Sequence, residues 1–156
     1  MEDEKIKCIV KQCVEQLNIN ERDIIRNNIS ERTITHKLAE YLQRNFPPTI
    51  SVDVEYNRNI ELGEKKPKYY QDEKYGMPDI IVHQRLSNEH NILIIEIKKQ
   101  NNKIIKDREK DFEKLEAFTT STNAEGYNFQ LGLFLDIPID NGEYKYTWYK
   151  DGHQVG

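Results

Sequence analysis

Apolar residues recur at helical spacing in two N-terminal stretches. Residues 4–17 place them at i, i+3, i+4 and i+7, which predicts a helix with one buried face. A second helix is expected from Ser30, which suits an N-cap, to about residue 45, just before two consecutive prolines. Its buried face would comprise Ile34, Leu38, Tyr41 and Leu42.

Alternating and continuous apolar runs predict strands further along the chain. Residues 79–83 and 91–99 flank a turn-rich connector and are expected to form a β-hairpin. Further strands are expected at 49–58, 127–137 and 143–150, and a third helix at 107–122. The order predicts an α/β fold with one mixed β-sheet of about five strands flanked by helices. Residues 1–156 would form a single domain, with 1–29 an N-terminal helical extension.

Two segments of the chain are rich in lysine. Residues 59–75 have no periodicity and are expected to form a long exposed loop. Their tyrosines and lysines could stack on bases and neutralise phosphates, although a solvated loop has the same composition. Residues 97–106 contain four lysines and no acid, which suits either a polyanion or a solvated loop.

The length, composition and charge of the chain limit the class of protein that it can be. A chain of 156 residues, with 37% hydrophobic and 32% charged residues, fits one soluble domain. The net charge of −4 gives no overall attraction to nucleic acid. No apolar run reaches 18 residues, and the N-terminus lacks the order of a signal peptide, so a cytoplasmic protein with no membrane contact is expected.

Charged residues interrupt the apolar hairpin. Asp79 opens its first strand, while Glu96 and Lys98 lie near the end of the second. Because side chains alternate along a strand, Glu96 and Lys98 must emerge on the same face of the sheet. On the helix that follows Ser30, Glu31 falls within about 20° of the core-facing Leu38. Glu31 either complements the helix dipole or reaches toward a buried polar site.

These residues suit a divalent metal ion. The chain has no phosphate-binding glycine loop, no Cys-x-x-Cys, no His-Glu-x-x-His and no Gly-x-Ser-x-Gly. Two carboxylates, a main-chain carbonyl and water can hold Mg²⁺ at about 2.1 Å and leave positions open for phosphate oxygens. Such an ion can polarise a phosphate and activate water, while a lysine positions or deprotonates that water or offsets developing charge.

The spacing of these residues resembles the signature of a nuclease superfamily. Pro78-Asp79, sixteen further residues and then Glu96-Ile97-Lys98 are similar to the PD-(D/E)xK motif of restriction-endonuclease-like proteins. The expected order of helix, three strands, helix and strand is also similar to the core of that superfamily. The resemblance implies a restriction-endonuclease-like core in which an acidic residue on the first helix, here Glu31, lies near the metal.

By this resemblance, Asp79 and Glu96 would bind Mg²⁺, or Mn²⁺ in its place, together with the main-chain carbonyl of Ile97. Lys98 would act on the attacking water. Glu31 would join through water or a second ion, brought from a helix packed on the same side of the sheet as Glu96 and Lys98.

The resulting expectation is a metal-dependent nuclease that hydrolyses phosphodiester bonds, with DNA favoured over RNA. Its specificity would be low, or it would come from a homodimer, from the 59–75 segment or from a partner recognition subunit. One alternative is a catalytically inactive nuclease-fold subunit that binds nucleic acid or serves assembly. Another is an unrelated α/β domain in which Glu96 and Lys98 form a surface pair.

Overall fold

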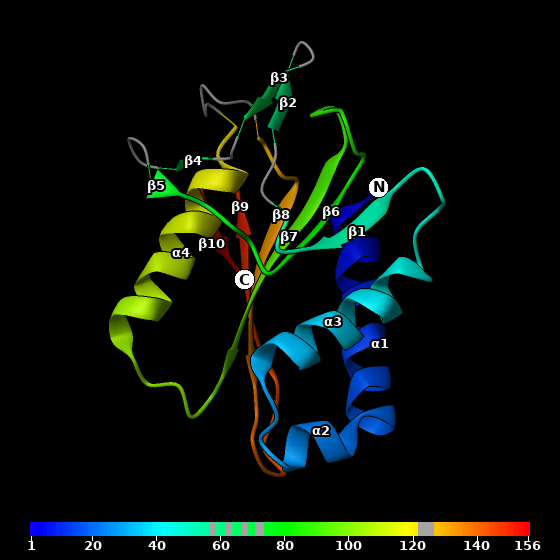
Figure 1. Cartoon of the computed structure of the whole chain (residues 1–156), viewed down its shortest axis with the longest axis vertical. Coiled ribbons are helices and arrows are strands. Elements are labelled where there is room, and N and C mark those ends of the chain that lie inside the picture. Colours follow the sequence, from blue (N-terminus) through cyan, green and yellow to red (C-terminus); the bar gives the residue numbers. More distant parts are fainter. Residues whose placement is uncertain (57–58, 62–63, 67–68, 71–73, 122–126) are drawn as a thin grey trace.

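The computed structural model describes residues 1–56, 59–61, 64–66, 69–70, 74–121 and 127–156, with the backbone alone for the parts of 59–75. Helices lie on both sides of one mixed sheet (Figure 1). The helices are α1 (Asp3–Asn20), α2 (Arg22–Arg26), α3 (Glu31–Gln43) and α4 (Ile105–Thr119). The strands are β1 (Ser51–Val54), β2 (Asn59–Glu61), β3 (Glu64–Lys66), β4 (Tyr69–Tyr70), β5 (Lys74–Tyr75), β6 (Ile80–His83), β7 (Asn91–Lys99), β8 (Leu131–Ile137), β9 (Lys145–Lys150) and β10 (His153–Val155).

The main sheet has six strands in the order β1-β6-β7-β8-β9-β10. Neighbouring strands are antiparallel except β7 and β8, which are parallel. A parallel pair needs a crossover connection, and α4 lies in that connection. The first seven residues of β7 are all buried, as expected for a central strand covered on both faces.

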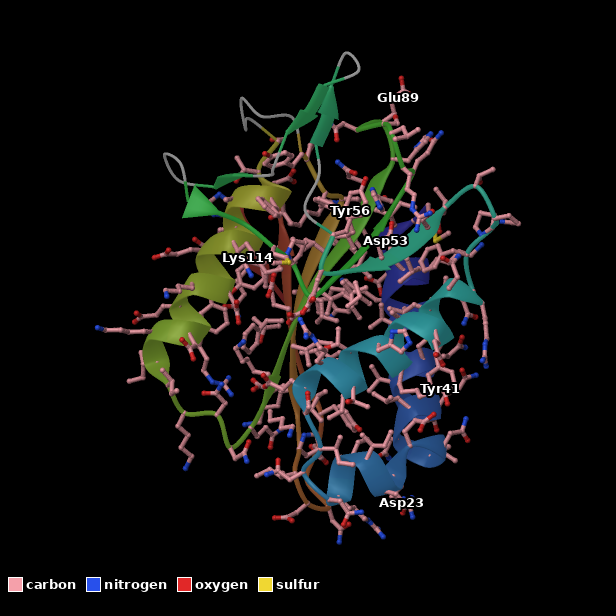
Figure 2. All side chains as sticks on the ribbon, in the orientation of Figure 1. Asp23, Tyr41, Asp53, Tyr56, Glu89 and Lys114 are labelled. Carbon is pink, nitrogen blue, oxygen red and sulfur yellow. The ribbon has the colours of Figure 1, made fainter. Side chains whose placement is uncertain are left out.

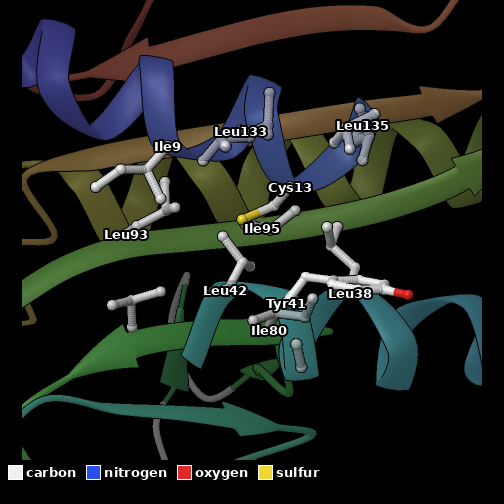
Figure 3. Packing of buried hydrophobic residues seen from close by; sticks show 14 of the residues in the cluster. Ile9, Cys13, Leu38, Tyr41, Leu42, Ile80, Leu93, Ile95, Leu133 and Leu135 are labelled. Atoms are coloured by element: carbon white, nitrogen blue, oxygen red, sulfur yellow. The ribbon is translucent and has the colours of Figure 1, made fainter. Parts of the chain in front are cut away.

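The two faces of the sheet are covered by different helices. α1 and α3 pack on one face, against alternate residues of β6, β7 and β8 (Figure 3). α4 packs on the other face in a smaller cluster that includes Leu115, Phe118, Phe134 and Tyr149. Alternation along β7 therefore assigns Ile95 and Ile97 to the α1 and α3 side, and Ile94 to the α4 side.

The three predicted helices, the hairpin of β6 and β7, and the buried residues Ile34, Leu38, Tyr41 and Leu42 of α3 are confirmed. The boundaries differ by several residues, most clearly for β1 and for β8, which begins at Leu131. The buried face predicted for α1 is confirmed, because its apolar side chains form part of the first cluster.

Several short elements were not predicted. α2 is a five-residue helix that buries Ile25. β10 pairs with β9 after Asp151 and Gly152, which have φ angles of 50° and 78°, as a tight hairpin turn requires. The sheet therefore has six strands rather than five. The prediction of a long loop at 59–75 is wrong for the described backbone, where β2 pairs with β3 and β4 with β5.

Within the described ranges, none of the helices combines the length and the apolar character needed to cross a membrane.

Candidate active site

The edge of β7 that faces β6 is open at its C-terminal end, because the pairing of the two strands stops at Ile80. Side chains occupy the edge beyond that point. Asp79 Oδ2 accepts a hydrogen bond from the N–H of Ile97 at 2.7 Å, and Glu31 Oε2 accepts one from the N–H of Lys99 at 2.8 Å. The N–H and C=O of one strand residue point to the same edge. The carbonyl of Ile97 therefore lies along this edge between the two carboxylates.

Glu96 and Lys98 point to the α4 face, where two residues of α4 meet them. Lys114 Nζ lies 2.9 Å from Glu96 Oε1, and Lys98 Nζ lies 3.0 Å from Asp111 Oδ2. Lys114 also lies 3.3 Å from Asp111 Oδ1, so the four charged groups form one network. Figure 2 shows Lys114 directed from α4 toward the sheet.

Burial is the largest influence on the pKa values of two predicted metal ligands, Glu96 and Asp79. Glu96 is 1% exposed, and its burial raises the pKa of its carboxyl group well above the usual range, although Lys114 opposes this shift. Burial also raises the pKa of Asp79, against the hydrogen bond from Ile97 and the charges of Lys114 and Lys98. An ionised carboxylate in such a place needs a nearby cation.

The lysines supply positive charge in this network. Burial alone would lower the pKa of Lys98, but the carboxylates of Asp111, Asp79 and Glu31 together outweigh it and the pKa is raised. The pKa of Lys114 is likewise raised despite burial, mainly by Glu96 and Asp111. With all groups ionised, the three carboxylates of Asp79, Glu96 and Asp111 against two ammonium groups leave a formal charge of −1.

Glu31 approaches from the opposite layer. α3 packs with α1 on the face that carries Ile95 and Ile97, so the prediction that the helix of Glu31 covers the same side as Glu96 and Lys98 is wrong. Glu31 nevertheless meets the site because it begins α3, which starts beside the end of β7. Its side chain reaches the edge of the strand rather than its face.

The sequence prediction missed Asp111, Lys114 and the carbonyl of Met77, which accepts a hydrogen bond from Lys114 Nζ at 3.3 Å. The sequence contains a pattern that could have identified Asp111. At 100° per residue it lies within about 20° of Phe118, on the apolar stripe of α4. This is the same kind of misplaced charge that singled out Glu31.

The donor set fits a hard divalent cation in its chemistry. Glu96 Oε1 and Asp111 Oδ2 are buried and have no hydrogen-bond partner among the described residues, although each has an ammonium within 3.0 Å. We interpret these as ion pairs whose orientation is poor for hydrogen bonding. Carboxylate and carbonyl oxygens are the ligands that Mg²⁺ and Mn²⁺ prefer. In the ranges that the structure describes, however, no three Asp, Glu, His or Cys side chains are close enough to hold a metal ion.

The basic stretch at 97–106 is divided between two roles. Lys98 joins the buried network, and Lys99 Nζ donates to the carbonyl and side-chain oxygens of Asn28. Lys103 and Lys106 are exposed. The tyrosine and lysine side chains of 59–75 lie outside the described residues.

Comparisons of the chain with protein-family models, with curated proteins and with solved structures find no match. The resemblance to the nuclease superfamily therefore rests on the residues of this chain alone.

Proposed function

We propose that this protein is a metal-dependent nuclease that hydrolyses phosphodiester bonds, with DNA favoured over RNA. One observation carries the proposal: residues from three distant segments meet around Ile97 at the end of β7. Asp79 and Glu31 bond to amides of its open edge, and Glu96 projects from the adjoining face with Lys98.

The chain path supports a restriction-endonuclease-like core. α3, β1, β6, β7, α4 and β8 follow the order of helix, three strands, helix and strand that the superfamily shares. Residues 1–156 would then be a single nuclease-like domain in which α1 extends the helical layer next to α3.

In this proposal Asp79, Glu96 and the Ile97 carbonyl would hold the divalent cation, with Glu31 beside them. When bound, Mg²⁺ or Mn²⁺ would polarise the phosphate and lower the pKa of water. Lys98 keeps its proton, because the carboxylates of Asp111, Asp79 and Glu31 together outweigh the effect of burial on its pKa. Its role is therefore to orient the attacking water and offset negative charge on the phosphate, rather than to act as a base.

The reaction consumes one water. The water oxygen bonds to phosphorus, the bond from phosphorus to the leaving oxygen breaks, and the leaving oxygen takes up a proton. The products are a phosphomonoester and a free hydroxyl group.

The test is cleavage of single-stranded DNA, double-stranded DNA and RNA in the presence of Mg²⁺, Mn²⁺ or EDTA. Asp79→Asn and Lys98→Met should each reduce the rate by about 100-fold or more, because each removes a charge that acts on the transition state. Asp23→Asn and Lys110→Met change exposed residues and serve as matched controls. Cleavage that survives both site substitutions would come from a contaminant and would refute the assignment.

A second candidate is a catalytically inactive subunit of the same fold that binds nucleic acid or serves assembly. Two observations favour it: Lys114 already pairs with Glu96, and the described residues include no three-carboxylate metal group. Binding of nucleic acid that is insensitive to EDTA, without cleavage of any substrate, would select this candidate.

A further inference from the structure

Lys114 is surrounded as a bound cation would be. Its Nζ lies 2.9 Å from Glu96 Oε1, 3.3 Å from Asp111 Oδ1 and 3.3 Å from the carbonyl oxygen of Met77. These oxygens come from β7, from α4 itself and from the segment before β6, and an ammonium has three protons to share among them. The Lys114 side chain is only 11% exposed, whereas most lysines keep their ammonium in water.

The contact of Lys114 with Glu96 is not explained by the need to attach α4 to the sheet alone. The same helix makes a separate ion pair with the sheet, in which Arg108 Nη2 lies 2.7 Å from Asp136 Oδ1 of β8. That pair involves none of the predicted metal ligands. Lys114 instead contacts Glu96, the most buried carboxylate of the candidate site.

We propose that Lys114 is the internal counter-ion of the metal-free site: its ammonium offsets the negative charge of Glu96 and Asp111 and leaves Glu96 when a divalent cation binds. This inference rests on the proposed metal-dependent function. Its physical basis is that a buried carboxylate without a partner is strongly destabilising, so the site needs a cation in both states. Since one oxygen of Glu96 cannot serve both cations fully, Lys114 and the metal compete.

Competition predicts the direction of a measurable change. Removing the ammonium should strengthen metal binding and, by linkage, make folding depend more on metal. In Lys114→Met, the Kd for Mn²⁺ measured by isothermal titration calorimetry should fall by roughly 10- to 100-fold, within the usual range of coupling between two binding events. Its melting temperature should be lower than that of the wild type in EDTA and should rise more on addition of Mn²⁺.

Three variants control for other effects. Lys110→Met removes an exposed charge from the same helix, and Arg108→Met breaks the ion pair between α4 and Asp136 of β8. Both should leave the Kd for Mn²⁺ unchanged. Glu96→Gln should weaken Mn²⁺ binding whether or not Lys114 is present.

A second measurement uses the unaltered protein and tests the counter-ion role even if Lys114→Met does not fold. Amine acetylation, followed residue by residue with mass spectrometry, should be slow at Lys114 and fast at Lys110 in EDTA. Addition of Mn²⁺ should accelerate acetylation of Lys114 and leave Lys110 unchanged.

The outcomes separate this inference from the proposed function. If the wild type binds Mn²⁺ but a folded Lys114→Met binds it no more tightly, the counter-ion role is refuted and the metal site stands. For an unfolded variant, unchanged acetylation of Lys114 on binding of Mn²⁺ to the wild type likewise refutes the counter-ion role. If neither the wild type nor a folded Lys114→Met binds Mn²⁺, the metal site and the counter-ion role both fail. If a folded Lys114→Met binds Mn²⁺ more tightly than the wild type does, the result supports both the metal site and the counter-ion role.

Discussion

The carboxylate of Asp79 accepts a 2.7 Å hydrogen bond from the backbone N–H of Ile97, which lies 18 residues further along the chain. Asp79 precedes β6, so its side chain continues the pairing of β6 with β7 where the strand backbone no longer does. This contact holds a predicted metal ligand against the Glu-x-Lys segment and gives Asp79 a structural role besides any catalytic one.

That double role can be separated by two substitutions. Asp79→Ala removes the acceptor of a buried N–H and should lower the free energy of unfolding by about 1–3 kcal/mol. Asp79→Asn keeps an oxygen acceptor and should lose less stability, while losing the negative charge. Urea unfolding measures both. Equal stability losses in the two variants would contradict the importance of this hydrogen bond.

The N-cap of α3 should contribute to the stability of the helix that begins with Glu31. Ser30 Oγ accepts a hydrogen bond from the N–H of Arg32 at 3.2 Å. Ser30→Ala should cost about 1 kcal/mol of stability, because this N–H loses its partner at the helix terminus. Ser30→Asp supplies another capping oxygen and should restore most of it. Thermal unfolding of the three proteins tests this, and a fully stable Ser30→Ala would exclude a role for the cap.

Asp53 should make stability depend on acid pH. Burial would raise the pKa of its carboxyl group, but hydrogen bonds from Arg85 and His83 outweigh burial and lower it below the usual value. A lowered pKa in the folded state means that the ionised form stabilises the fold. This stabilisation is present above the unfolded pKa of about 3.9 and is lost as the pH falls below it.

The measurement is a difference between the wild type and Asp53→Asn. The wild type should lose more stability than the variant as the pH is lowered from about 5 to about 2, because only the wild type has this carboxylate to protonate. The difference cancels contributions from Asp79 and Glu96, whose raised pKa values act in the opposite direction. If the stability of the two proteins changed with pH in the same way, the assignment of this pH dependence to Asp53 would be refuted.

Gly132 is required for the close approach of α4 to β8. A Cβ at this position would lie 3.0 Å from Thr119 Cγ2, 3.2 Å from Tyr149 Cβ and 3.3 Å from Leu115 Cδ2. Gly132→Ala should therefore destabilise the fold by about 1–3 kcal/mol through overpacking. Gly156→Ala is the control, since a Cβ there meets no atom within 4 Å. A Gly132→Ala protein as stable as this control would contradict the packing argument.

Gly132→Ala should also displace the charged residues of α4, Asp111 and Lys114, which depend on the same packing. A loss of the proposed nuclease activity larger than the loss of folded protein would report that displacement.

Local sequence patterns determined much of the fold and part of the candidate site. The 3.6-residue period predicted α1, α3 and α4, and the apolar runs predicted β6 and β7. The two-residue period of a strand placed Glu96 and Lys98 on one face, because this direction is fixed by the strand itself. In contrast, β10 was missed although Asp151-Gly152 is a hairpin signal, because three residues without apolar alternation give little pattern.

Only the tertiary structure decided which charged groups meet. The sequence singled out Glu31, but not that it would bond to Lys99 from the layer opposite α4. It also did not indicate Lys114, which the fold pairs with Glu96. The physical reason is that local periodicity fixes where a side chain points relative to its own element. The face of the sheet that a helix covers depends instead on the chain path and on which apolar surfaces are buried together.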